Sequence, residues 1–186
     1  MKAIDTYFNC NYHRSRLEAR WAVFFKALGI KYQYEPEGFV SANGSKYLPD
    51  FYLPETTLRG KSKGVYIEIK HQNYDKEYNV FENTISKWFT EPLVMFCGYP
   101  FQHIWGNWDD IQENGYQLVP PIDTYMLFWI CNKCGHSKIE YMEGSYDECP
   151  ICDGVGDSKK LMAAAHEAIV KRFEYDSFNT NINQRE

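Results

Sequence analysis

The chain has 186 residues, of which 44% are hydrophobic, 17% aromatic and 24% charged. This composition is typical of a soluble globular protein and excludes a chain that is disordered over most of its length. The length allows one domain of ordinary size with a small appendage, whose core needs no covalent cross-links.

Charge is distributed unevenly along the chain, whose net charge is -5. Residues 1–70 hold 11 Lys+Arg against 7 Asp+Glu, a net of +4, whereas residues 71–186 hold 9 against 18, a net of -9. The basic part favours a phosphate-facing surface, although such asymmetry also arises without a polyanionic partner. No apolar run approaches the roughly 18 residues of a membrane span, and the polar N-terminus lacks the core of a secretory signal. We therefore expect a cytoplasmic protein without a membrane partner.

The first seventy residues predict one helix and three strands. Apolar residues recur at helical spacing from Ser15 to Leu28, and Gly29 is a suitable C-cap. Residues 31–39 predict a short strand and a turn, residues 43–45 a hairpin turn, and residues 46–53 the returning strand. The polar, basic and glycine-bounded segment 56–64 predicts an exposed loop before the strand 65–70.

The rest of the chain continues the same alternation. Residues 78–89 place apolar side chains on one helical face, and residues 92–98 predict a buried strand. Residues 99–124 show no clear periodicity, residues 159–173 predict a helix, and the tail 176–186 has little apolar content. The order of elements predicts an α/β core around a mixed sheet.

Two acidic residues interrupt strands that are otherwise apolar. The strand period places Glu68 and Lys70 on one face of the segment 65–70 and its aliphatic side chains on the other. Asp50 follows Pro49, which marks the start or the edge of a strand. Buried charges are costly unless they are paired or bound to something. Two carboxylates on adjacent strands can chelate one hard cation, and Mg²⁺ suits such a site.

Lys70 is better interpreted as a stabilising cation than as a base. A base at neutral pH would need its pKa lowered from about 10.4 by roughly three units, or about 4 kcal/mol. A neighbouring carboxylate and a phosphate both shift the pKa of a lysine in the opposite direction. The expected role of Lys70 is to orient a water molecule and to neutralise developing charge.

These residues carry a resemblance to a known superfamily. Pro49-Asp50 followed by Glu68-Ile69-Lys70 resembles the PD-(D/E)xK nucleases, and residues 14–30 look like the first helix of that fold. The resemblance implies a restriction-endonuclease-like core with a mixed central sheet flanked by helices. It further implies Asp50 and Glu68 as ligands of a catalytic Mg²⁺ (or Mn²⁺), Lys70 as the catalytic cation and Glu18 as an outer ligand.

The implied activity is metal-dependent hydrolysis of phosphodiester bonds in DNA, either duplex or branched. The wider string SRLEARWAVFF, YLPDFYL and YIEIK also looks like phage-associated and bacterial proteins with a zinc ribbon and a terminal helix after this core. A symmetric double-strand cut would require a homodimer, which no sequence feature demonstrates.

Glu18 has a second interpretation, because Ser15 and Glu18 also fit a capping box at the start of the helix. On a helical wheel Glu18 lies at the rim of the buried face, about 20° from Phe25. The two roles can coexist if Glu18 contacts the metal through water.

Basic residues near these motifs are candidates for contacts with nucleic-acid phosphates, with an ordinary solvated position as the alternative for each. The densest cluster is the segment 59–63. The candidates are Arg14, Arg16 and Arg20, with Lys46, Arg59, Lys61 and Lys63.

Four cysteines form two CxxC pairs separated by 14 residues, Cys131 with Cys134 and Cys149 with Cys152. This spacing predicts four thiolates around a structural Zn²⁺ in a zinc ribbon, with disulfides or an iron-sulfur cluster as alternatives. Four thiolates fill the coordination sphere, so this zinc is not expected to hydrolyse anything. Acidic residues around the ribbon argue against tight phosphate contact and favour stapling of the chain or docking of a protein partner.

The predicted organisation is a nuclease-like core at 1–125, a zinc ribbon at 126–157, a C-terminal helix at 158–175 and a tail at 176–186. The leading function is a magnesium-dependent DNA endonuclease. A protein that keeps the fold without catalysis, and binds nucleic acid or a partner protein through its ribbon, is the alternative. A structure-selective resolvase would share the chemistry and differ only in its substrate.

Overall fold

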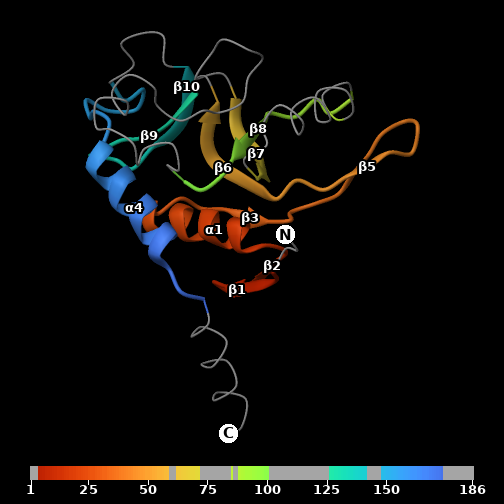
Figure 1. Cartoon of the computed structure of the whole chain (residues 1–186). Helices are drawn as coiled ribbons and strands as arrows, with labels where there is room; N and C mark the ends of the chain where they lie inside the picture. Colours follow the sequence, from red (N-terminus) through yellow and green to blue (C-terminus); the bar gives the residue numbers. More distant parts are fainter. Residues whose placement is uncertain are drawn as a thin grey trace, which may run out of the picture.

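A computed structural model describes residues 4–58, 62–71, 85, 88–100, 126–141 and 148–173. Within these ranges the fold is α/β, with a six-stranded mixed sheet and two helices (Figure 1). Neither described helix combines the length and apolar character needed to cross a membrane. The predicted helix 78–89, the segment 99–124 and the tail 176–186 lie largely or wholly outside the described residues.

Helix α1 spans Arg16–Leu28, as the spacing of its apolar residues predicts. Ser15 is its N-cap and accepts a hydrogen bond from the backbone N–H of Glu18. Gly29 ends the helix in the left-handed conformation, with φ of 76°, and its N–H meets the carbonyls of Lys26 and Phe25. Glycine adopts this conformation without the strain that a Cβ would cause. The predicted C-cap is confirmed.

The centre of the sheet is an antiparallel pair, β6 (Phe51–Leu58) and β7 (Ser62–Lys70). Strand β8 (Leu93–Cys97) lies parallel to β7. On its other edge β6 pairs first with β3 (Gln33–Tyr34) and then, in parallel, with β10 (Ser137–Tyr141). Strand β9 (Met126–Ile130) is antiparallel to β10. Strands of the predicted core and of the predicted ribbon therefore share one sheet, and the domain division remains a prediction.

The prediction of an exposed loop over residues 56–64 is wrong at both ends. Strand β6 continues to Leu58 and β7 begins at Ser62, with Thr57 opposite Lys63. The outer edge of this extension pairs with β10, and the fully buried hydroxyl of Thr56 lies 2.8 Å from the hydroxyl of Ser137. The polar composition of the segment concealed this pairing, because the partner strand follows about eighty residues later in the chain.

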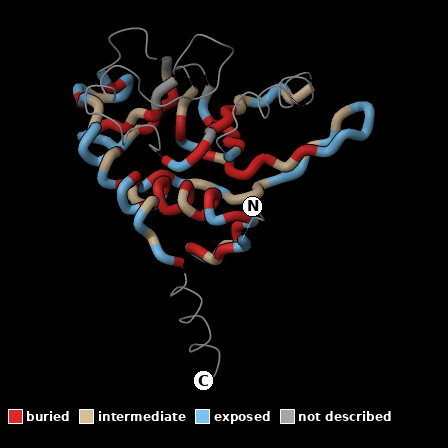
Figure 2. Tube along the Cα trace, viewed as in Figure 1, coloured by how far each residue is buried: buried red, intermediate tan, exposed pale blue. Residues whose placement is uncertain are grey.

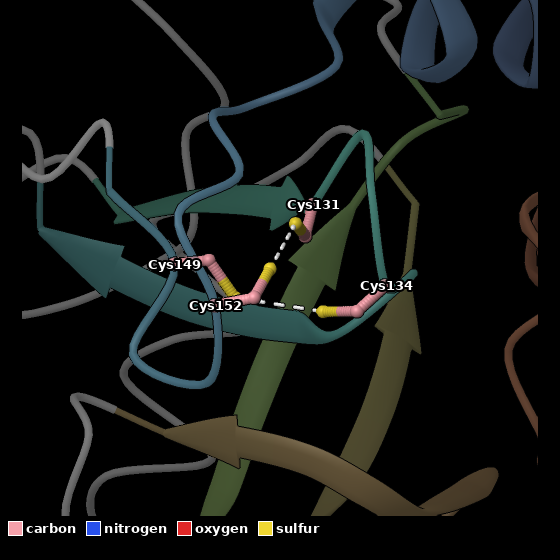
Figure 3. A group of neighbouring side chains, drawn as sticks. All are labelled: Cys131, Cys134, Cys149 and Cys152. Atoms are coloured by element: carbon pink, nitrogen blue, oxygen red, sulfur yellow. Dashed lines mark hydrogen bonds between the residues drawn. The ribbon is translucent and has the colours of Figure 1, made fainter.

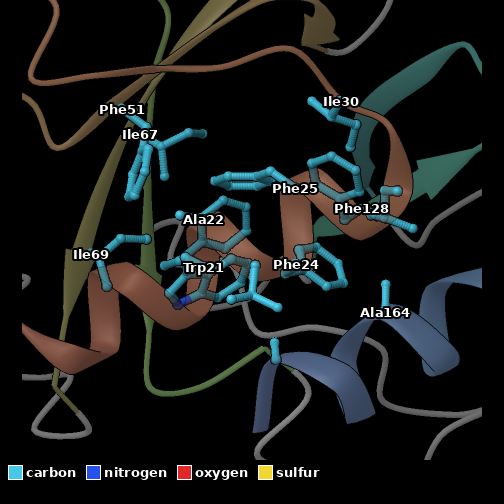
Figure 4. Packing of buried hydrophobic residues seen from close by; sticks show 14 of the residues in the cluster. Trp21, Ala22, Phe24, Phe25, Ile30, Phe51, Ile67, Ile69, Phe128 and Ala164 are labelled. Atoms are coloured by element: carbon cyan, nitrogen blue, oxygen red, sulfur yellow. The ribbon is translucent and has the colours of Figure 1, made fainter. Parts of the chain in front are cut away.

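The core lies between the sheet, α1 and helix α4 (Ser158–Val170), as Figure 4 shows. Trp21 of α1 stacks on Phe96 of β8 with ring centroids 4.4 Å apart. Phe25 meets Phe51 of β6 edge to face at 5.4 Å. Burial of such a side chain contributes about 2–3 kcal/mol, so α1 is held firmly against the sheet.

Two small hairpins complete the described structure. One joins β1 (Thr6–Phe8) to β2 (Asn11–His13), and the other joins β4 (Phe39–Val40) to β5 (Lys46–Tyr47). The β4–β5 hairpin projects from the body of the molecule, and its tip is exposed (Figures 1 and 2). Gly44 in its turn has φ of 84°, which confirms the predicted turn at residues 43–45.

Candidate functional site

Asp50 and Glu68 lie side by side across the central strand pair. Asp50 directly precedes β6, Glu68 belongs to β7, and Phe51 pairs with Ile67 between them. Their exposed fractions are only 4% and 5%. The aliphatic residues of β7 lie in the hydrophobic core, as the strand period predicts. The structure thus brings together two buried carboxylates on neighbouring strands.

Each oxygen of Asp50 accepts one hydrogen bond. Oδ2 accepts from the backbone N–H of Ile69 at 2.7 Å, and Oδ1 accepts from Nη2 of Arg14 at 3.0 Å. Burial, followed by the charge of Glu68, raises the pKa of Asp50 to about 8, although the N–H of Ile69 acts in the opposite direction. The carboxyl group is therefore largely protonated at neutral pH unless a cation stabilises its charge.

Glu68 is fixed by a tyrosine and by the motif lysine. The hydroxyl of Tyr47 donates to Oε2 at 2.7 Å, and Nζ of Lys70 donates to Oε1 at 2.5 Å. Burial and the charge of Glu68 raise the pKa of Tyr47, which keeps that tyrosine a proton donor. Because Tyr47 belongs to β5, the projecting hairpin is tied directly to the acidic pair.

Glu18 makes the capping interactions that its position allows. Its backbone N–H donates to Oγ of Ser15 at 3.2 Å, and the same hydroxyl donates to Oε1 at 2.8 Å. Oε2 accepts from the hydroxyl of Tyr34 at 2.6 Å and from the backbone N–H of Arg14 at 3.1 Å. Ser15 is confirmed as the N-cap, whereas the side chain of Glu18 returns to the hydroxyl of Ser15 and to the N–H of Arg14 instead of the N–H of Ser15 that a capping box uses. The role of Glu18 as an outer metal ligand remains a prediction.

Arg14 links this acidic group to a carboxylate that the sequence did not single out. Its Nε lies 2.5 Å from Oε1 of Glu35, while its Nη2 meets Asp50. Glu35 has φ of 44°, an uncommon left-handed conformation for a residue with a Cβ. The guanidinium remains about half exposed, so it faces both the acidic group and the solvent.

The three predicted acidic residues do not converge as tightly as a complete ligand set. In the described part of the chain, the four cysteines form the only group of three or more ligands whose atoms all lie within 4.8 Å of one another. Asp50 and Glu68 interact most directly, whereas Glu18 is held at the start of α1 by Ser15 and Tyr34.

The predicted phosphate-binding residues lie on different surfaces. Arg16 begins α1 and lines a pocket beside α4, Lys46 lies on the projecting hairpin, and Lys63 lines a pocket beside the ribbon. Arg20 donates instead to the carbonyl oxygens of Ala168 and Ile169 at the end of α4. Arg59 and Lys61 lie outside the described residues.

The four predicted zinc ligands point toward one another from two turns, as Figure 3 shows. The sulfurs of Cys131 and Cys152 lie 3.6 Å apart, as do those of Cys134 and Cys149. A tetrahedron with Zn–S bonds of about 2.3 Å has sulfurs roughly 3.8 Å apart. The cluster is therefore consistent with a structural zinc site.

The backbone around these cysteines has little spare room. The N–H groups of Lys133 and Ile151 each point to a cysteine sulfur, at 3.4 Å from Cys131 and from Cys149 respectively. A Cβ added to Gly154 would lie 2.3 Å from the sulfur of Cys131. Glycine is thus the residue that allows the second turn to approach the first.

Two hydrogen bonds of the candidate site were not predicted from the sequence. Tyr34 and Tyr47 donate to Glu18 and Glu68, although they lie 16 and 21 residues away in the chain. The alternation around Tyr34 predicts a strand but gives no indication of where its hydroxyl points.

No protein-family model matches this chain, and neither a curated protein nor a solved structure matches it.

Proposed function

We propose that this protein is a magnesium-dependent phosphodiester hydrolase that acts on DNA, a nuclease of the PD-(D/E)xK type. The observation that carries the proposal is the buried pair Asp50 and Glu68 on neighbouring strands, with Lys70 beside it. Burial, followed by the charge of Glu68, raises the pKa of Asp50 to about 8. A purely structural role gives no reason to bury two like charges so close together.

Local charge supports a divalent cation as the ligand. Four carboxylates face two cations in this group, which leaves a net charge of -2 when all six groups are ionised. The carboxylates are those of Glu18, Glu35, Asp50 and Glu68, and the cations are Arg14 and Lys70. Carboxylate oxygens are the ligands that Mg²⁺ prefers, and each oxygen of Asp50 and Glu68 retains a lone pair beside its present hydrogen bond.

Asp50 and Glu68 would hold the metal directly, and Glu18 would act through water. A bound Mg²⁺ supplies a Lewis acid that offsets phosphate charge and lowers the pKa of a water molecule. The N–H of Ile69 and the hydroxyl of Tyr47 fix the two carboxylates in place, since each donates to one of them at 2.7 Å. This preorganisation spares the site a rearrangement when substrate arrives.

Lys70 would neutralise charge on the phosphate in this scheme. Its side chain is one-third exposed and lies on the same face of β7 as Glu68. Arg14 is the second cation of the group. Its half-exposed guanidinium can release Asp50 and bind a phosphate oxygen instead. The chain thus offers two cations to a negatively charged substrate at the place where its carboxylates meet.

One observation favours the alternative of a protein without catalysis. Every side-chain oxygen of Glu18, Asp50 and Glu68 already accepts a hydrogen bond from the protein. In such a protein Arg14 and Lys70 would be permanent partners of the carboxylates. Calorimetric titration with Mg²⁺ separates the two cases. In the enzyme Mg²⁺ must bind in competition with Arg14 and Lys70, whereas the protein without catalysis has no need to bind the ion.

For the cysteine cluster we propose one structural Zn²⁺. Strand β9 ends one residue before Cys131, and β10 begins three residues after Cys134. The ion would therefore close the turn that joins these strands and would fix β10 against the end of β6. Its proposed role is to complete the sheet.

The decisive experiment is incubation with supercoiled, linear, branched and single-stranded DNA and with RNA, in Mg²⁺, Mn²⁺ or EDTA. We expect cleavage of DNA with either metal and none in EDTA. Inactivity under every condition would refute the enzyme, and cleavage that persists in EDTA would refute the metal dependence.

A further inference from the structure

A pocket of about 380 Å³ lies between the first half of α1 and the end of α4. Figure 1 shows the two helices next to each other. Of the seven described residues that line it, four are basic and none is acidic, although the chain as a whole has a net charge of -5. The lining consists of Arg16, Arg20, Ile169, Val170, Lys171, Arg172 and Phe173.

The end of a helix ordinarily repels anions, because its last carbonyl groups carry partial negative charge. Here Nη1 of Arg20 donates to the carbonyl oxygens of both Ala168 and Ile169. This contact neutralises the end of α4 within the pocket. The helix terminus therefore counts less against an anion in the pocket than an uncapped terminus would.

Aromatic rings keep the basic groups near the pocket in position. The guanidinium of Arg20 lies 5.7 Å from the ring centroid of Phe173, and Nζ of Lys171 lies 5.7 Å from that of Phe8. Such contacts orient a cation without cancelling its charge. The pocket therefore combines a concave shape with oriented positive charge, which are the features of an anion site.

This pocket is separate from the acidic site. At about 100° per residue, Arg16 and Arg20 lie about 160° around α1 from Glu18, on either side of the opposite face. A helix with its side chains is about 10 Å across. A single phosphate cannot contact both places, whereas a long polyanion can.

We propose that this pocket binds a backbone phosphate of a nucleic acid, at a distance from the acidic site. The choice of nucleic acid as the polyanion rests on the proposed function, whereas the anion site itself rests on the charge of the pocket. Arg16 and Arg172 are its most exposed basic residues and would make the direct contacts. Arg20 positions the site through α4 and is left intact in the test.

The test measures binding in EDTA, where no metal-dependent cleavage occurs. A fluorescent 20-base-pair duplex is titrated with protein between 50 and 200 mM salt, and anisotropy gives the affinity at each concentration. Each phosphate contact contributes about 0.9 to the slope of log affinity against log salt. The double variant Arg16→Ala/Arg172→Ala is expected to lower this slope by about two and to weaken binding about tenfold at 100 mM salt.

The matched control is Lys159→Ala/Lys160→Ala, which removes two exposed charges from the opposite end of α4. We expect the control to keep the wild-type slope. Three outcomes would each overturn the proposal. The two double variants could lose binding equally, the slope could stay unchanged in Arg16→Ala/Arg172→Ala, or the wild type could fail to bind the duplex at 50 mM salt. If the double variant loses its circular dichroism spectrum, Arg172→Ala alone, with an expected slope change of about one, takes its place.

The two proposals fail in different ways. A wild-type protein that binds DNA through the pocket but never cleaves it would refute the nuclease and leave the anion site intact. If the wild type cleaves DNA and the variant Arg16→Ala/Arg172→Ala keeps the wild-type salt slope, the nuclease stands and the anion site is refuted.

Discussion

The acidic group and the cysteine cluster are assembled in different ways. The four cysteines come from two short turns, which are also joined by the contact of Asn132 with the N–H of Val155 and by the ion pair of Lys133 with Asp153. Asp50 and Glu68 meet only because two strands pair, and they are surrounded by donors from other segments. Local spacing therefore specifies the first site, whereas the tertiary fold specifies the second.

Loss of the cysteine cluster is expected to have the largest effect. Cys149→Ser should abolish binding of one equivalent of zinc and destabilise the protein by on the order of 5 kcal/mol, because zinc affinity is also folding free energy. Elemental analysis and thermal melts measure the two quantities. The matched control is Cys10→Ser, at an exposed thiol outside the cluster. An unchanged melting temperature in Cys149→Ser would show that this site adds nothing to the fold.

Changes in the acidic group should affect activity far more than stability. Lys70→Ala is expected to lower the rate of DNA cleavage by about 10²–10³-fold, the usual cost of losing one electrostatic contact to the transition state. Single-turnover assays in Mg²⁺ measure this loss. Lys31→Ala removes an equally charged but exposed partner of Glu55 and should leave the rate unchanged. Wild-type turnover in Lys70→Ala would contradict the role assigned to that lysine.

Metal binding at the acidic group should depend on pH, unlike a site with permanently ionised ligands. The pKa of Asp50 is raised to about 8, so its carboxyl group must lose a proton before it can bind Mg²⁺. Affinity is therefore expected to rise about tenfold per pH unit between roughly pH 6 and 8 and to level off above pH 8. Calorimetric titration at several pH values measures this change, and Asp50→Asn should remove most of the binding. An affinity that is flat over this range would contradict the ionisation proposed for Asp50.

The smallest expected effect concerns Arg14, whose guanidinium competes for Oδ1 of Asp50. Arg14→Ala should strengthen Mg²⁺ binding by about threefold to tenfold, since an ion pair with one half-exposed partner is worth about 1 kcal/mol. Calorimetry at pH 8.5 isolates this effect from the ionisation of Asp50. Lys26→Ala, on the same helix, is a suitable control. Weaker binding in Arg14→Ala would show that the arginine supports the site instead of competing for it.

Sequence reasoning succeeded where the determining interactions are local. The left-handed conformation of Gly29 and the alternation in β7 act over a few residues, and the four cysteines lie within one short stretch of the chain. It failed for residues 56–64, because the pairing of Thr57 with Lys138 is invisible in a segment of polar composition. The magnesium-dependent activity and the restriction-endonuclease-like fold remain predictions.

In the acidic group, sequence patterns predict which residues are buried but not which atoms they contact. The burial of Asp50 and Glu68 follows from the apolar strands around them. The hydroxyl donors Tyr34 and Tyr47 reach the acidic residues from other strands, which no local pattern indicates.

The parallel pairing of β6 with β10 has a consequence for synthesis of the chain. Leu58 pairs with Ile139, and Phe24 of α1 contacts Phe128 of β9 at 5.8 Å. A nascent chain therefore cannot close its core around α1 until the last third of the protein has left the ribosome. We expect a chain ended at residue 125 to expose this core and to bind a hydrophobic dye, whereas the full chain should not. The acidic group, which depends on α1 and on the central strands, would then form only at the end of translation.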